Sequence, residues 1–184
     1  GNTQFILDWG TDSEDGGHLS IGKTQAFWGN FGVLVRALAY IWTQGPQGLR
    51  QVAETAVLNA NYLMRRLAGT FDLPYDRACK HEFVVSAARI KKATGVRLAD
   101  IAKRQLDYGF HPGTVYFPLI IDEALMVEPT ETESRETLDR WAAALEAVVQ
   151  EAREHADVVR GAPYTTPVHK LDEVKAARQP DLHW

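Results

Sequence analysis

Cysteine is almost absent from this chain, which has only Cys79 among its 184 residues. An internal disulfide needs two cysteines, so a hydrophobic core must hold the fold together. The hydrophobic content of 45% is enough for a core of that kind. No basic or helix-start neighbourhood that would activate the thiol is visible around Cys79, and we expect an inert structural residue.

Positive charge is also scarce, because 20 lysines and arginines face 24 acidic residues and leave a net charge of −4. A nucleic-acid-binding protein normally carries a basic stripe, so nucleic acid is a poor candidate partner. No run of about 18 apolar residues and no charged-then-apolar leader occurs, which argues against a membrane segment. We therefore expect a soluble, cytoplasmic protein without membrane or nucleic-acid partners.

Metal-ligand spacing is missing as well. The six histidines are dispersed and show no recognised spacing with each other or with the single cysteine. The sequence therefore predicts no metal site. The histidines are His18, His81, His111, His155, His169 and His183.

Two helices dominate the first part of the chain. Residues 32–43 are apolar on nearly every side, which is typical of a helix buried between other elements. Gly45-Pro46 then ends this helix and begins another, because proline is tolerated in a first turn. Apolar residues three and four apart continue the second helix to about Leu67, with Gly69 as its C-cap.

Strands and helices alternate over residues 71–160. The run HEFVVSA is strand-like, and a helix from Leu98 ends at Gly109. The runs FPLII and ALMV flank Asp122-Glu123 as two strands of a hairpin. The last helix opens with a capping box of Thr130 and Glu133 and carries an apolar stripe: Leu138, Trp141, Ala142, Leu145, Val148, Val149 and Ala152. This order predicts an α+β layer with the helices on one face of a small sheet.

Four runs resemble, in the same order, one family: the glycine decarboxylase (P-protein) component of the glycine cleavage system, subunit 2 of its two-subunit form. They are KTQAFWGNFGVLVRALAYIWTQGPQGLRQVAETAVLNANYLMRRL, CKHEFVVSA, LDYGFHPGTVYFPLIIDEALMVEPTETESRETL and GAPYTTPVHKLDEVKAARQPDLHW. The resemblance implies the C-terminal small domain of a fold-type-I pyridoxal-phosphate (PLP) enzyme, an α+β fold within the α/β family. The implied parts are an arm left from the large PLP domain (1–24), interdomain helices (25–70), the small α+β domain (71–160) and an extended C-terminal tail (161–184).

The family's PLP lysine lies in a His-Lys-Thr motif that does not occur in this chain. The resemblance therefore implies a C-terminal fragment without catalytic residues, inactive alone and not binding PLP. The intact protein would decarboxylate glycine and pass the aminomethyl group to the lipoyl arm of the H-protein, with decarboxylase subunit 1 as a further partner. Without the cofactor domain, residues 32–43 would expose an apolar surface, and we expect self-association through it.

Five residues are candidates for the site. By analogy with this fold type, Gly29 and Asn30 occupy the loop that reaches the cofactor phosphate of a neighbouring subunit; the alternative is a plain helix start with Asn30 as cap. His111 and Thr114, in FHPGT, are candidates for the substrate cleft, as is His81. The alternatives are a Pro-Gly turn for the first pair and a strand-end polar group for His81.

Two positions depart from the family's usual pattern. Gly113 stands where the family has proline or Ala-Pro, which predicts a looser loop. Pro163-Tyr164 replaces a common Pro-His, so any task of that histidine would be performed differently here.

A nucleotide-binding protein is the alternative function, because residues 17–24 match the phosphate-loop pattern G-x-x-x-x-G-K-[ST]. Residues 118–123 resemble the strand that would end in a Mg²⁺-binding acid. A phosphate loop must come directly after a strand and open a helix. Here seven residues separate Trp9 from Gly17, and Gly29 and Gly32 interrupt the segment after Thr24. A non-catalytic interaction module is the third possibility.

Overall fold

The computed structural model describes residues 29–181, and the chain divides into two compact units, Gly1–Pro46 and Gln47–Trp184. Helix α1, Phe31–Leu67, begins in the first unit and is interrupted at Gly45, where φ is 62° and ψ is 178°. Glycine takes such a positive φ at little cost, and Pro46 then opens the next helical turn. The predicted break at Gly45-Pro46 is therefore confirmed, as is the end of the helix at Leu67.

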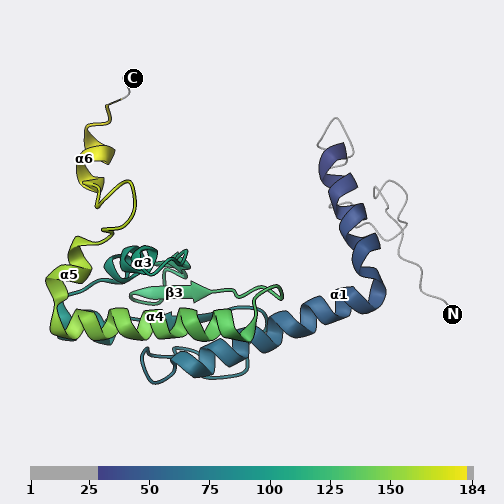
Figure 1. The fold of residues 1–184 in the computed structure, drawn as a ribbon, viewed down its shortest axis with the longest axis horizontal. Helices are drawn as coiled ribbons and strands as arrows, with labels where there is room; N and C mark the ends of the chain where they lie inside the picture. The colour runs from purple at the N-terminus through teal and green to yellow at the C-terminus, as the bar shows by residue number, and fades with distance from the viewer. Residues whose placement is uncertain (1–28, 182–184) are drawn as a thin grey trace, which may run out of the picture. The chain divides into compact units, whose positions relative to one another are not determined.

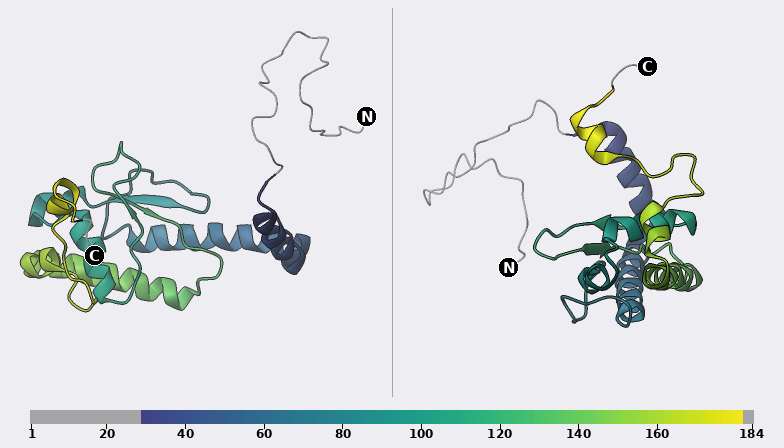
Figure 2. Two further views of the ribbon diagram at one scale, coloured as in Figure 1. Left: turned by 90° about the horizontal axis from the view of Figure 1, so that it is seen from above. Right: turned by 90° about the vertical axis from the view of Figure 1, so that its left-hand side faces the viewer.

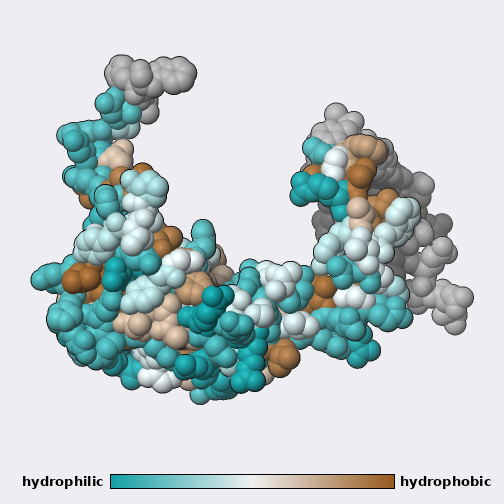
Figure 3. Space-filling model, viewed as in Figure 1, coloured by the Kyte–Doolittle hydropathy of each residue, from teal (hydrophilic) through white to brown (hydrophobic). Residues whose placement is uncertain are grey.

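The helical part of the first unit exposes its apolar side chains. Its large apolar residues are between 45% and 80% exposed, and Figure 3 shows hydrophobic (brown) residues on the visible surface of this part of α1. They are Phe31, Val33, Leu34, Val35, Leu38, Tyr40, Ile41 and Trp42. This exposure agrees with the expectation that residues 32–43 present an apolar surface in this chain, because a helix that is apolar on nearly every side needs more cover than the described residues give it.

The second unit is built around one hydrophobic core. Helix α4, Arg135–Glu154, lies alongside the C-terminal part of α1 (Figures 1 and 2), and both contribute buried residues to that core. The apolar stripe predicted for α4, with Leu145 and Val148 fully buried at its centre, faces inward. Polar contacts join the two helices at their surface, as between Arg66 Nη2 and Glu146 Oε2 at 3.2 Å.

A three-stranded antiparallel sheet completes this core. Strands β1 (Phe83–Ser86), β2 (Thr114–Val115) and β3 (Ala124–Val127) lie in the order β1-β3-β2. Phe83 pairs with Val127, and both are buried. Helices α2 (Ala88–Thr94) and α3 (Leu98–Asp107) add further residues to the same core. The α+β class is therefore correct.

The predicted hairpin is only partly correct. β2 and β3 are paired, but residues 117–121 form a loop rather than a strand, and Leu119 and Ile120 are 84% and 80% exposed. Three adjacent apolar residues suggested a strand, yet they have no partner strand within the described residues. The apolar run alone could not distinguish the two cases.

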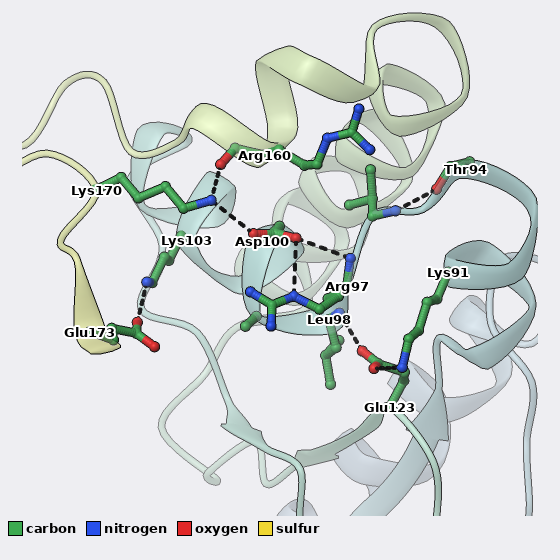
Figure 4. A network of polar contacts seen from close by, with 12 residues as sticks. Lys91, Thr94, Arg97, Leu98, Asp100, Lys103, Glu123, Arg160, Lys170 and Glu173 are labelled. Carbon is green, nitrogen blue, oxygen red and sulfur yellow. Dashed lines mark hydrogen bonds and ion pairs between the residues drawn. The ribbon is translucent and has the colours of Figure 1, made fainter. Parts of the chain in front are cut away.

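Glu123 anchors the base of this loop. Its φ is 49°, and its buried carboxylate accepts hydrogen bonds from Lys91 Nζ and the Leu98 N–H, each at 2.6 Å (Figure 4). The bond to Glu123 raises the pKa of the Lys91 ammonium group. A buried carboxylate with two such donors fixes the loop onto α2 and α3.

Three further expectations need correction. The N-cap of α4 is Ser134, whose Oγ accepts from the Thr137 N–H at 3.1 Å, in place of the predicted Thr130 and Glu133 box. Gly69 does not take the left-handed conformation of a typical C-cap glycine. The short helices α2, α5 (Ala156–Gly161) and α6 (Glu173–Arg178) were not predicted, because six or seven residues are too few for a clear periodic pattern. None of the described helices is long and apolar enough to cross a membrane.

The segment after α5 is fastened to α3. Lys170 Nζ lies 3.2 Å from Asp100 Oδ1 and also donates to the Arg160 carbonyl, while Lys103 pairs with Glu173 (Figure 4). Asp100 is 4% exposed, so this contact attaches the segment to a buried acid.

Candidate functional site

Three chain segments meet at one end of the sheet. In the antiparallel order β1-β3-β2, the start of β1, the end of β3 and the start of β2 lie at the same end. His81 lies two residues before β1, and Glu128 directly follows β3. His111 lies three residues before Thr114, where β2 begins. The fold therefore brings the predicted cleft residues of the second unit to one edge.

His81 and Glu128 form an exposed ion-pair contact, with Nε2 3.7 Å from Oε1. Each of His81, Glu82 and Glu128 offers a ligand atom, and these atoms lie within 4.8 Å of one another. An imidazole and two carboxylates are suitable ligands for a divalent metal ion. No sequence pattern indicated this grouping, because Glu128 is 46 residues beyond Glu82 and only strand pairing brings the two together.

His111 lies at the mouth of a cavity of about 320 Å³. Its Nδ1 is 2.8 Å from the Pro112 carbonyl oxygen, so an N–H at that position would leave Nε2 as the acceptor. The cavity is lined by Leu63, Phe110, His111, Pro112, Gly113, Val127, Glu128, Pro129, Glu133, Thr137, Leu138 and Trp141. Thr114 lies outside this cavity, in a neighbouring hollow that His111 and Glu128 also line.

Gly113 is packed against β3. A Cβ added at this position would lie 2.6 Å from the Met126 carbonyl oxygen and 3.2 Å from Leu125 Cδ1. The first distance is far below ordinary van der Waals contact. The prediction that Gly113 loosens the loop is wrong, because its missing side chain allows the loop to approach the strand.

Asn30 caps α1. Its Oδ1 accepts from the Val33 N–H at 3.3 Å, and its carbonyl accepts from the Leu34 N–H at 3.0 Å. Gly29 has a φ of 142°. The cap leaves the N–H groups of Phe31 and Gly32 without acceptors among the described residues, a donor arrangement that suits an anion. Residues 17–24 and Trp28 lie outside the described residues.

A charged cluster around Arg104 attaches the segment after α5. Arg104 Nε and Nη1 donate to Glu151 at 2.8 Å and to Asp107 at 2.9 Å, and the guanidinium lies over the rings of Tyr108 and Tyr164, 5.5 and 5.6 Å from their centres. The hydrogen bonds from Arg104 hold the pKa of Glu151 below its ordinary value. Tyr164 thus packs on a cation, a contact that its sequence position did not reveal.

Cys79 has no sign of nucleophilic activation. Its side chain is partly buried, and this burial raises the pKa of the thiol. Its backbone N–H and carbonyl are both bonded to the Asn61 amide, at 3.0 and 2.8 Å. A raised thiol pKa lowers the thiolate fraction at neutral pH, as expected for a structural cysteine.

Comparisons with known proteins point to one family. The family model described as "Glycine dehydrogenase, C-terminal domain" matches residues 52–165. "Probable glycine dehydrogenase (decarboxylating) subunit 2" of Desulforamulus reducens is 58% identical over 165 residues, 90% of this chain and 34% of the relative. The proteins of the same name from Bacillus velezensis and Thermotoga petrophila are 58% and 55% identical over 90% of this chain and 33% and 35% of their own lengths. The chain thus spans about a third of the length of the curated relatives it matches.

Proposed function

This chain belongs to the glycine dehydrogenase C-terminal domain family, and from that premise we propose that it is the C-terminal part of a PLP-dependent enzyme that decarboxylates glycine. The enzyme would act in the cytoplasm together with decarboxylase subunit 1 and would deliver the aminomethyl group to the lipoyl arm of the H-protein. The observation that carries the proposal is 58% identity to glycine dehydrogenase (decarboxylating) subunit 2 over 90% of this chain.

Gly29 and Asn30 are the residues of this chain that we assign to the cofactor phosphate. The capped start of α1 supports this assignment, because the N–H groups of Phe31 and Gly32 are available donors at the positive end of a helix. When bound, the cofactor supplies an electron sink for the charge left on the substrate carbon as CO₂ departs. The contribution of this chain would be to hold an anion and orient it.

His111, Thr114 and His81 are the residues that we assign to the substrate cleft. Their convergence at one end of the sheet supports this assignment. The His111 ring is oriented by the Pro112 carbonyl and borders a cavity whose walls are largely apolar. Such walls exclude water from a bound substrate, and a neutral imidazole at the mouth can accept or return a proton at Nε2.

The proposal is tested in the full-length enzyme assembled with subunit 1, PLP and lipoyl H-protein. Glycine-dependent CO₂ exchange is expected, and His111→Ala should lower kcat/KM by at least about tenfold, a loss typical of a positioned proton-transfer group. His155→Ala is the matched control, because His155 is exposed at the junction of α4 and α5 and lines neither hollow. Absence of glycine-dependent exchange would refute the activity, whereas equal effects of the two variants would refute only the role of His111.

The nucleotide-binding alternative is weakened by Glu123. Residues 118–121 do not form a strand, and the Glu123 carboxylate is already bonded to Lys91 and the Leu98 N–H. An acid held this way in the core cannot serve a Mg²⁺ ion at a phosphate loop without breaking both bonds.

Self-association through the N-terminal part of α1 is a further component of the proposal. Leu34 and Leu38 are 55% and 47% exposed on a helical segment that exposes several other large apolar residues, and contact of such side chains with water is unfavourable. We expect the 184-residue chain to associate at about 100 μM, and Leu34→Glu or Leu38→Glu to shift it toward monomer in sedimentation equilibrium. Leu58→Glu is the control, because Leu58 is 67% exposed but lies in the second unit. A strict monomer at that concentration would contradict the expectation.

A further inference from the structure

The cavity beside His111 has the size and the walls of a small-molecule site. Its volume of about 320 Å³ lies at the lower end of the range for ligand pockets. Leu63, Val127 and Leu138 are buried residues that form an apolar floor, and Phe110 and Trp141 add two aromatic rings. A cavity of this kind favours the apolar part of a compact ligand.

The charged lining of the same cavity has one sign. Glu128 and Glu133 are its acidic lining residues, both of them exposed, and none of the described lysines and arginines lines the cavity. Within the described part of the chain, neither carboxylate is paired with a lysine or an arginine; Glu128 has His81 at 3.7 Å as its ion-pair partner. Two carboxylates beside low-dielectric walls create a negative potential that concentrates cations.

The aromatic rings distinguish between kinds of cation. A hydrated metal ion gains little from apolar walls, and the exposed group of His81, Glu82 and Glu128 offers it better ligands at the rim. An organic ammonium group instead gains from carboxylates, from aromatic faces and from burial of its alkyl chain. The combination in one cavity therefore selects an organic cation with a short apolar body.

We propose that this cavity binds a small aliphatic amine in its protonated form. Its ammonium group lies against Glu128 and Glu133, and its alkyl chain lies between Phe110 and Trp141. Thr137 lines the same cavity, and its hydroxyl, which shares a hydrogen bond with Ser134 Oγ at 3.1 Å, has a second lone pair that can accept from the ammonium group. The cavity is the one that His111 borders in the proposed substrate cleft, so the assignment rests on that part of the proposed function; its binding test is separate from the activity assay.

The test measures binding of n-butylammonium and of its neutral isostere 1-butanol to the 184-residue chain at neutral pH. Titration followed by NMR shifts of the cavity residues should show saturable binding of n-butylammonium with a dissociation constant on the order of 1 mM. The isostere should bind at least about tenfold more weakly, since it lacks the charge. Comparable affinity for 1-butanol, or no saturable binding of n-butylammonium, would overturn the proposal.

Charge variants locate the site. Glu128→Gln and Glu133→Gln keep the side-chain shape at exposed positions, so folding should be unaffected, and each should weaken n-butylammonium binding by about tenfold. Glu136→Gln is the matched control, because Glu136 is an exposed acid in the first turn of α4 that does not line the cavity. If Glu136→Gln lowers the affinity for n-butylammonium as much as the two cavity variants do, the binding depends on net charge alone, and the proposal is overturned.

Discussion

Replacing Asp107 by alanine should lower the free energy of unfolding by about 3 kcal/mol, the scale for breaking a buried ion pair. The Asp107 side chain is 3% exposed and accepts from Arg104 Nη1 at 2.9 Å. Its Oδ1 accepts from the Tyr164 and Thr165 N–H groups, each at 2.7 Å, and from Thr165 Oγ1 at 2.9 Å. Removing the carboxylate therefore leaves Arg104 Nη1, two backbone N–H groups and the Thr165 hydroxyl without their acceptor, while the guanidinium, 17% exposed, keeps its pairing with Glu151.

Urea denaturation at pH 7 measures this loss, and hydrogen exchange of residues 164–173 should accelerate with it. Asp157→Ala is the control, because the Asp157 side chain pairs with Arg160 but is 97% exposed. An exposed pair of this kind contributes about 0–1 kcal/mol. A similar small effect in Asp107→Ala would show that the segment after α5 is held by other contacts.

The effect of Asp107 should depend on pH in a defined direction. Burial opposes ionisation of this carboxyl, but the N–H groups of Thr165 and Tyr164 and the Arg104 guanidinium outweigh it and hold its pKa below the ordinary value. The unfolded protein then binds more protons than the folded protein in acid, so the stabilisation is present above the unfolded pKa of about 4. It is lost as the pH falls through the lower folded pKa. The difference in the free energy of unfolding between wild type and Asp107→Ala should therefore become smaller below about pH 4.

Gly113→Ala should destabilise the second unit by about 2 kcal/mol, as expected for overpacking against backbone. The added Cβ would lie 2.6 Å from the Met126 carbonyl oxygen, and this oxygen belongs to a paired strand that cannot move freely. Either β2 or the Gly113 loop has to shift, which also changes the wall of the cavity beside His111.

Gly69→Ala provides the comparison for Gly113→Ala. A Cβ at Gly69 meets nothing within 4 Å, and its φ is outside the left-handed region. The free energy of unfolding of Gly69→Ala should stay within about 0.5 kcal/mol of wild type or rise slightly, because alanine has fewer conformations than glycine in the unfolded chain. Equal urea midpoints for the two variants would show that the Gly113 loop yields without cost.

The individual helices were largely predictable from the sequence. The break at Gly45-Pro46, the end of α3 before Gly109 and the inward stripe of α4 all result from turn residues and apolar spacing. Each of these signals lies within a few residues of the feature that it predicts, so no distant partner is needed. The resemblance to glycine decarboxylase could also be recognised from the sequence, and the family match over residues 52–165 supports it.

The site was predictable only as separate residues. His81 and His111 could be singled out as polar groups beside predicted strands, but Glu128 could not, because its proximity to His81 depends on the pairing of β1 with β3. The packing of Gly113 on β3 has the same origin. Both depend on strand register, which is set by the burial of one sheet face.

The long helices, the family and the residue types available to the site can all be read from the order of the amino acids. Two other features exist only in the folded chain. Glu123 anchors the loop at residues 117–121, and Asp107 accepts a hydrogen bond from the Tyr164 N–H, 57 residues further along the chain. Local patterns report hydrophobic spacing and turn preferences, whereas these contacts form once the core has brought distant segments together. A buried carboxylate must then find its donors wherever the fold has placed them.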